Sequence, residues 1–104
     1  MMKNKQSILG LLGLATRARK IALGEGLIIQ KISSSNQNLL VFLANDAGKN
    51  FTKKINDKAK FYNHTVISEF SSEELSQAIG NKNRKAVLVI DKGFIERLIE
   101  LYNS

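Results

Sequence analysis

The side chains that could carry chemistry in this sequence are few, and most of them are cations. The chain has 104 residues, with 16 Lys and Arg against nine Asp and Glu, one His and no Cys. Without cysteine there is no thiol nucleophile or thiolate metal site, and the lone His64 cannot hold a metal by itself. Asp46 and Asp91 each follow an apolar run, where α/β sheets tend to place functional groups, but helix capping explains both. We therefore predict no catalytic residue, no metal site and no cofactor.

Two glycine pairs also fall short of a ligand-binding motif. Gly10 and Gly13 form one pair, and Gly24 and Gly26 form the other. A dinucleotide-binding fingerprint needs three glycines directly after a strand, and a P-loop needs Gly-Lys-Ser/Thr at the start of a helix. Neither motif is present, so the sequence predicts no small-molecule substrate.

The excess positive charge is concentrated in the middle of the chain. Residues 16–60 carry nine basic and three acidic side chains, whereas residues 61–104 carry five basic and six acidic ones. Lys and Arg side chains that contact phosphates release counterions and so give affinity that does not depend on base sequence. The pattern favours one basic face for a polyanion, although small basic proteins also use such charge for solubility alone.

The spacing of apolar residues predicts helices that alternate with strands. In the first half of the chain we expect a helix around residues 8–15 and a strand at residues 21–23. A glycine turn at residues 24–26 then leads into a second helix that opens at Leu27. The polar run at residues 33–38 predicts a loop.

The second half continues this alternation. The unbroken apolar run at residues 39–43 predicts a strand that is buried on both faces at the centre of a sheet. Residues 45–48 are expected to turn the chain and cap a third helix that has one apolar and one lysine-rich face. The remaining predicted elements are a strand at residues 65–67, a helix with a capping box at Ser71 and Glu74 that stops at Gly80, a strand at residues 86–90, and a last helix capped by Asp91. The chain is thus expected to be one α/β domain, a three-layer α/β/α sandwich, over residues 1–104.

Three further features of the sequence bear on its partners and its location. Five Phe and two Tyr stand at core-like spacings, which leaves few candidates for stacking on bases. No apolar run reaches the ~18 residues of a membrane span, and no signal-peptide cleavage site follows the N-terminus. We expect a monomeric cytoplasmic protein that has no membrane partner.

Several short stretches of sequence resemble one family in their order and spacing. They are LLGLATRARK at residues 11–20, LANDA at residues 43–47, TKKI at residues 52–55, AIG at residues 78–80 and DKGF at residues 91–94. From about Ile8 to Leu101 the chain resembles the YlxQ-like bacterial branch of the ribosomal protein L7Ae/L30e superfamily, which binds kink-turn RNA. The resemblance implies an α/β/α sandwich with a mixed four-stranded sheet and a kinked RNA duplex with tandem sheared G·A pairs as partner.

The resemblance also implies a set of contact residues. By match, Gly24, Glu25, Gly26 and Gln30 approach the bases, and a loop that begins at Ile79 and Gly80 covers a flipped-out base. Together with the charge pattern, it assigns eight side chains to phosphates: Arg17, Arg19, Lys20, Lys31, Lys53, Lys54, Lys82 and Arg84.

We therefore predict a non-enzymatic, ribosomal-protein-like RNA-binding domain, and two alternatives stay open. After the glycine turn, the best-known RNA binders of the superfamily carry Asn-Glu and then Lys three residues on, where this chain has Gly26, Leu27 and Gln30. Leucine cannot accept a hydrogen bond from a guanine amino group, so base readout is expected to be weaker. The first alternative is a ribosome-associated or protein-interaction accessory domain without kink-turn selectivity. The second is a small enzyme that uses Asp46 or Asp91.

Overall fold

Helices and strands alternate along the chain as the apolar spacing predicts. The computed structural model describes residues 4–104. Its elements are α1 (Lys5–Arg17), β1 (Ile21–Leu23), α2 (Glu25–Ser34), β2 (Leu40–Leu43), α3 (Lys49–Phe61), β3 (Thr65–Ile67), α4 (Ser72–Ile79), β4 (Ala86–Val89) and α5 (Lys92–Asn103).

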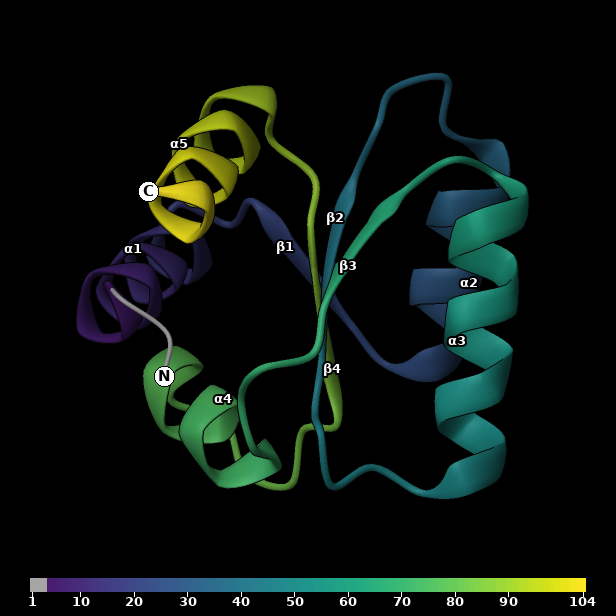
Figure 1. The fold of residues 1–104 in the computed structure, drawn as a ribbon, viewed down its shortest axis with the longest axis horizontal. Coiled ribbons are helices and arrows are strands. Elements are labelled where there is room, and N and C mark those ends of the chain that lie inside the picture. Colours follow the sequence, from purple (N-terminus) through teal and green to yellow (C-terminus); the bar gives the residue numbers. More distant parts are fainter. Residues whose placement is uncertain (1–3) are drawn as a thin grey trace.

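The strands form one mixed sheet in the order β1-β4-β2-β3. β2 and β3 run parallel, whereas β4 pairs antiparallel with both β1 and β2. Leu23 pairs with Val87, and Leu43 pairs with Ala86. The ends of β1 and β2 and the start of β4 therefore meet at one edge of the sheet, which lies at the bottom of Figure 1. We call it the lower edge.

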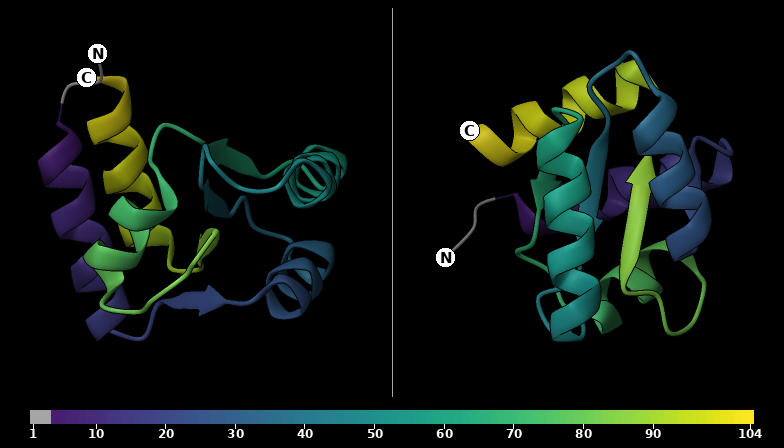
Figure 2. Two further views of the ribbon diagram at one scale, coloured as in Figure 1. Left: turned by 90° about the horizontal axis from the view of Figure 1, so that it is seen from below. Right: turned by 90° about the vertical axis from the view of Figure 1, so that its right-hand side faces the viewer.

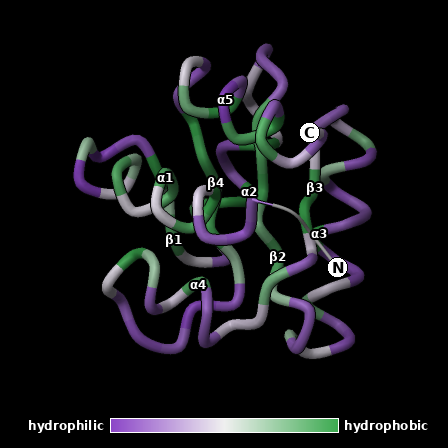
Figure 3. Tube along the Cα trace, turned by 60° about the vertical axis from the view of Figure 1, so that its left-hand side comes forward, coloured by the Kyte–Doolittle hydropathy of each residue, from purple (hydrophilic) through white to green (hydrophobic). Residues whose placement is uncertain are grey.

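Helices cover both faces of this sheet, which confirms the predicted α/β/α sandwich. α2 and α3 lie on one face, and α1, α4 and α5 lie on the other (Figure 1). The right-hand view of Figure 2 shows α2 and α3 side by side across the sheet. In Figure 3 hydrophobic residues follow the strands, while much of the outer path of α3 is hydrophilic.

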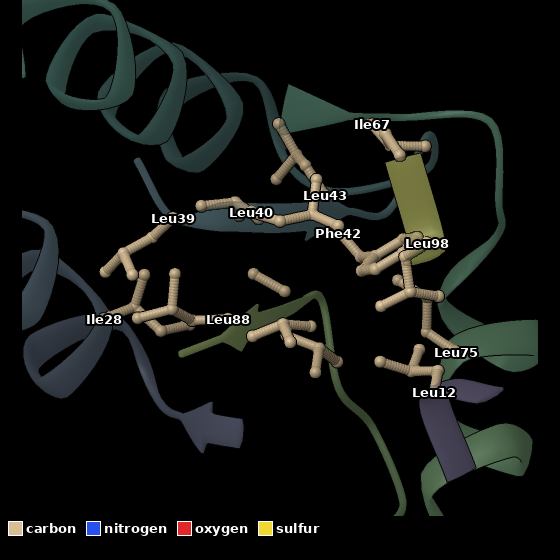
Figure 4. Packing of buried hydrophobic residues seen from close by; sticks show 14 of the residues in the cluster. Leu12, Ile28, Leu39, Leu40, Phe42, Leu43, Ile67, Leu75, Leu88 and Leu98 are labelled. Atoms are coloured by element: carbon tan, nitrogen blue, oxygen red, sulfur yellow. The ribbon is translucent and has the colours of Figure 1, made fainter. Parts of the chain in front are cut away.

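The core lies between these layers and is built mainly from the two central strands. Every residue of β2 and β4 is buried, because both faces of each strand are covered. Figure 4 shows Leu12, Leu75 and Leu98 packing towards the sheet from one layer and Ile28 from the other. The rings of Phe42 and Phe70 meet at a centroid distance of 5.8 Å. One continuous apolar core therefore holds the elements that position the surface loops.

The second helix is longer than the sequence predicted. It begins at Glu25, because Gly24 takes φ 93° and ψ 136° and serves as its N-cap. The amide of Ile28 donates to the carbonyl of Gly24 at 2.9 Å. The helix also runs through Ser34, whose hydroxyl donates to the carbonyl of Gln30 at 2.9 Å. The predictions of a turn over residues 24–26 and of a loop from residue 33 were therefore wrong at their boundaries.

The predicted capping role of Asp46 was also wrong, whereas that of Asp91 is confirmed. α3 starts after Gly48, and no side chain caps it. Asp46 instead accepts from the amide and the hydroxyl of Ser72, both at 2.9 Å, at the start of α4. Asp91 accepts from the amide of Phe94 at 3.0 Å and caps α5. Both carboxylates therefore have structural partners.

His64 is a core residue that joins two elements. It is 8% exposed, and its Nδ1 accepts from the amide of Leu39 at 2.9 Å. Its Nε2 lies 2.7 Å from the carbonyl of Ile32. With Nδ1 as the acceptor, the proton is assigned to Nε2, which donates to that carbonyl. His64 thereby ties the end of α2 to the residue before β2.

Candidate nucleic-acid interface

A hollow at the lower edge brings three segments together that are far apart in sequence. Its volume is about 160 Å³. The strand register explains the meeting, because the chain leaves β1 and β2 at this edge and enters β4 there. We call this site the junction; its lining residues are Gly24, Glu25, Ile28, Phe51, Asn83, Arg84, Lys85 and Ala86.

Two helices begin beside the junction without side-chain caps. The N-caps of α2 and α3 are Gly24 and Gly48, and among residues 4–104 no side chain accepts a cap hydrogen bond from either helix. The N-termini of α4 and α5, on the other face of the sheet, are closed by Ser71 and Asp91. The first amides of a helix carry partial positive charge and have no intrahelical acceptor. Two uncapped N-termini at one edge can therefore bind anionic groups.

Glu25 and Lys54 connect the two helices at the junction. Nζ of Lys54 lies 2.8 Å from Oε2 of Glu25, and both side chains are about half exposed. The pair offsets the negative charge of Glu25 beside the start of α2. As a result, the ion pair reduces the repulsion that this carboxylate exerts on an approaching anion.

The loop between α4 and β4 is held by its own hydrogen bonds. Gly80 ends α4 at φ 69°, and Asn83 takes φ 58°. Ser76 holds two residues of the loop. Its carbonyl accepts from the amide of Asn81 at 3.0 Å, and its Oγ accepts from the amide of Arg84 at 2.9 Å. Nε of Arg84 donates to Oδ1 of Asn81 at 3.1 Å. The loop therefore presents Arg84 in a defined conformation.

A second polar network, formed by Asp46, Ser72 and Lys85, contacts the loop between α4 and β4 at Lys85. Asp46 binds Ser72, and Nζ of Lys85 lies 3.4 Å from the hydroxyl of Ser72. The hydrogen bond from the Ser72 amide, followed by that from its hydroxyl, holds the pKa of Asp46 below its ordinary value of 3.8. Asp46 is therefore an anionic positioning residue for the loops at the lower edge.

The structure gathers four of the predicted site residues at the junction itself. These are Gly24, Glu25, Arg84 and, through its ion pair, Lys54. Gly80 and Lys82 are exposed in the loop just before Arg84, whereas Ile79 is only 7% exposed and packs in the core. Gly26 and Gln30 lie on the exposed side of α2. Any contribution of Ile79 to a base contact must come from its backbone.

The remaining predicted residues lie away from the junction. Lys20 precedes β1, about 13 Å of extended chain from Gly24, and its carbonyl accepts from Ile90. Lys31 lines a separate hollow together with Ile90. Arg17 lines a groove between α1 and α4. Arg19 is exposed in the turn that follows α1.

Lys53 and Lys54 are adjacent in sequence but point in different directions. Consecutive helix residues are about 100° apart around the axis. Lys54 reaches Glu25 of α2, whereas Lys53 pairs with Asp57 of its own helix at 2.7 Å. The structure therefore does not bring Lys53 to the junction.

The sequence placed Asn83 and Lys85 in the expected contact loop after Ile79 without singling them out, and it missed Phe51 as a junction residue. Lys85 directly follows Arg84 in a loop, and that charge pair was the available signal. The contribution of Phe51 depends on the packing of α3 beside α2, which no local pattern encodes. The expectation that the aromatic residues belong to the core was wrong for Phe61, which is 75% exposed.

Within residues 4–104, no group of three or more His, Cys, Asp or Glu could hold a metal ion. Over the same residues, no helix combines the length and the apolar character needed to cross a membrane.

Known proteins resemble this chain both in sequence and in structure. Residues 6–99 match the profile of the ribosomal protein L7Ae/L30e/S12e/Gadd45 family. The chain is 41% identical over 98 residues to RNA-binding protein YlxQ of Enterococcus faecium, covering 94% of this chain and 93% of the relative. It is 42% identical over 91 residues to RNA-binding protein YlxQ of Bacillus subtilis (strain 168), covering 88% and 90%. A solved structure of a protein of unknown function from Bacillus halodurans C has a TM-score of 0.86 at 36% identity and covers 93% of this chain and 97% of that chain.

Proposed function

The chain belongs to the ribosomal protein L7Ae/L30e/S12e/Gadd45 family, and from that premise we propose that it is a non-enzymatic RNA-binding protein that recognises a kink-turn or a similarly kinked RNA. Two relatives of more than 40% identity are named RNA-binding proteins. Asp46 and Asp91, which could have served an enzyme, are both engaged in positioning helix starts.

The observation that carries this proposal is the arrangement of positive charge at the junction. The uncapped N-termini of α2 and α3 lie beside Lys54, Arg84 and Lys85. Helix amides and cations at one concave site suit a place where phosphates are crowded. A sharp kink in a duplex brings phosphates of its two arms close together, and a straight duplex does not. The junction therefore favours a kinked RNA.

Recognition at this site depends more on shape than on base edges. The exposed first turn of α2 offers Gly26 and Leu27, neither of which has a polar side chain. Gln30 lies one turn further along the exposed side of the helix and can hydrogen-bond a base edge. We propose that the backbone of Gly24 to Gly26 approaches the RNA and that Gln30 supplies the side-chain contact to a base.

The proposal extends to the state of the protein in the cell. Residues 1–104 would act as one RNA-binding domain, monomeric and cytoplasmic, with RNA as partner and no small-molecule substrate or cofactor. Arg17, Arg19, Lys20, Lys31 and Lys82 lie outside the junction, and we propose that they contact phosphates only where the RNA extends beyond it.

The test is a titration of a labelled kink-turn RNA at several salt concentrations. Each phosphate that the protein neutralises contributes about 0.7 to 0.9 to the slope of log affinity against log salt. With the three cations of the junction, Lys54, Arg84 and Lys85, we expect an overall slope of about 2 to 3. Failure of the RNA to bind at low salt would contradict the proposal, and so would an affinity that does not change with salt.

A further inference from the structure

Phe61 is an aromatic side chain that the fold leaves in water. It is the last residue of α3 and is 75% exposed, whereas the other Phe and Tyr residues are buried or half-buried. Its ring packs edge-on against Tyr62, with centroids 4.8 Å apart and an interplanar angle of 82°. A phenyl ring that is not buried contributes little to folding. The exposed ring is therefore available for a contact with another molecule.

Phe61 stands at the end of a row of lysines on α3. Residues spaced i, i+4 and i+7 share one side of a helix, and Lys54, Lys58 and Phe61 have this spacing. All three are exposed. Lys54, at the foot of the row, is bound to Glu25 at the junction. The row thus runs about 10 Å along α3 from the junction to the phenyl ring.

The charge of α3 indicates the kind of molecule that this row would contact. The helix contains five lysines and a single acid, Asp57. Among the ion pairs formed within residues 4–104, only Lys53 and Lys54 of these lysines take part. Lys58 is thus available for a phosphate. A cationic track with an aromatic side chain is the combination that binds single-stranded nucleic acid, because every base has a face that can stack on a ring.

We propose that Lys54, Lys58 and Phe61 form a second RNA-contact row, which holds a single-stranded segment next to the kinked duplex, with Phe61 stacked on an unpaired base. This proposal rests on the proposed function, because the segment belongs to the RNA bound at the junction. The row extends that site from the α2 N-terminus along the outer surface of α3. Unpaired nucleotides beside the kink then add affinity that a blunt duplex cannot supply.

The absence of tryptophan from the chain allows a direct experiment. Phe61→Trp introduces a single fluorophore at the end of the row. Asn103→Trp is the matched control, because Asn103 is exposed at the end of α5, on the other face of the sheet. Each variant is titrated with a labelled kinked duplex that is blunt or that carries an unpaired adenine tail on either strand end. RNA anisotropy and tryptophan emission are read in the same samples.

We expect the tailed RNA to quench the emission of Phe61→Trp and the blunt RNA to leave it unchanged. Asn103→Trp should respond to neither RNA. If both RNAs bind by anisotropy without this difference in quenching, the row is not an RNA contact and the proposed function stands. If neither RNA binds, both the row and the proposed function are wrong.

Affinity measurements give an independent readout of the same contact. Phe61→Ala should weaken binding of the tailed RNA about tenfold and leave the blunt RNA unchanged. Phe61→Leu keeps an apolar side chain without a ring, and we expect the same loss. Because the site is exposed, both variants should melt like the wild type. Equal affinity of wild type and Phe61→Ala for the tailed RNA overturns the proposal. A response of Phe61→Trp to polyglutamate, but not to tailed RNA, overturns it in favour of an acidic protein partner.

Discussion

Lys54 of α3 lies 2.8 Å from the carboxylate of Glu25, the first residue of α2. This ion pair is half exposed, and such pairs contribute about 1 kcal/mol or less to stability. Its importance is electrostatic, because it places a cation between two uncapped helix N-termini and offsets the acid at the junction. We therefore expect substitution of Lys54 to change RNA binding more than it changes the stability of the fold.

The first prediction concerns the two adjacent lysines of α3. Lys54→Ala should weaken RNA binding and reduce the salt slope by about one, because it removes a phosphate contact. It also leaves Glu25 unpaired beside the RNA. Lys53→Ala, which removes a cation paired with Asp57 on the same helix, should have a smaller effect on both quantities. Salt-dependent titrations of the two variants check this difference.

Glu25→Gln supplies the control for the charge at the junction. In the background of Lys54→Ala it removes the unpaired acid, and we expect it to restore part of the lost affinity. An equal loss of affinity in Lys53→Ala and Lys54→Ala would show that α3 acts only through its overall charge.

A second prediction separates stability from binding at the start of α2. A Cβ at Gly26 or at Gly10 would meet no atom within 4 Å, and both residues are in helices. Replacing either by Ala should stabilise the protein by about 0.5–1 kcal/mol. Gly26→Ala should nevertheless weaken RNA binding, because its methyl group stands on the surface that the RNA approaches. Gly10→Ala, on α1, should leave RNA binding unchanged. Thermal melts and RNA titrations measure the two effects, and unaltered RNA affinity in Gly26→Ala would contradict a close backbone approach.

The N-cap of α2 gives a third prediction, about the backbone. Gly24 has φ 93°, a conformation that residues with a Cβ rarely adopt, although the site itself is open. Gly24→Ala should lower the free energy of unfolding by about 1–3 kcal/mol. Gly48, the N-cap of α3, has φ −58°, so Gly48→Ala loses only a favourable N-cap residue and should cost less than Gly24→Ala. Urea unfolding compares the two variants, and similar losses in both would show that backbone strain at Gly24 is not the cause.

A fourth prediction concerns pH. The hydrogen bond from the Ser72 amide lowers the pKa of Asp46 below its ordinary value of 3.8. Because the folded pKa is lower than the unfolded one, the carboxylate stabilises the fold above about pH 4, and this stabilisation is lost as the pH falls through the folded pKa. Glu74 behaves in the same way, since its pKa is lowered first by its hydrogen bond with Lys5 and then by that with the Ser71 amide.

The measurement is urea unfolding of the wild type and of Asp46→Asn at about pH 5 and about pH 3. The free energy of unfolding of the wild type should fall from about pH 5 to about pH 3, and that of Asp46→Asn should fall by less. NMR titration of the Asp46 carboxyl group gives the folded pKa directly. A folded pKa at or above 3.8 would contradict the role of Ser72.

The fold could be predicted from the sequence largely because its signals are local. Unbroken apolar runs identified β2 and β4, and the pattern of Ser71 and Glu74 identified the start of α4. The start of α2 was misplaced, because an N-cap glycine at positive φ and a glycine in a turn look alike in sequence. Asp46 was assigned to the nearest helix, whereas its partner is Ser72, 26 residues away.

The site was less predictable, because it depends on which loops the sheet register brings together. Gly24 and Arg84 were singled out separately, and only the pairing of Leu23 with Val87 shows that they share one hollow. The orientation of Lys53 away from α2 and the exposure of Phe61 follow from how α3 packs. A count of charges along the chain does not show which side of a helix faces its neighbour and which faces solvent.

The central claim is that the junction selects a kinked RNA, and competition between two RNAs tests it most directly. A labelled kink-turn RNA with tandem sheared G·A pairs is displaced by unlabelled copies of itself or by an unkinked duplex of the same length and composition, over a range of salt. We predict that the kinked competitor is the more effective at every salt concentration, even as both affinities fall. Equal competition by the two RNAs throughout would contradict the claim and would favour an accessory domain that holds RNA by charge alone.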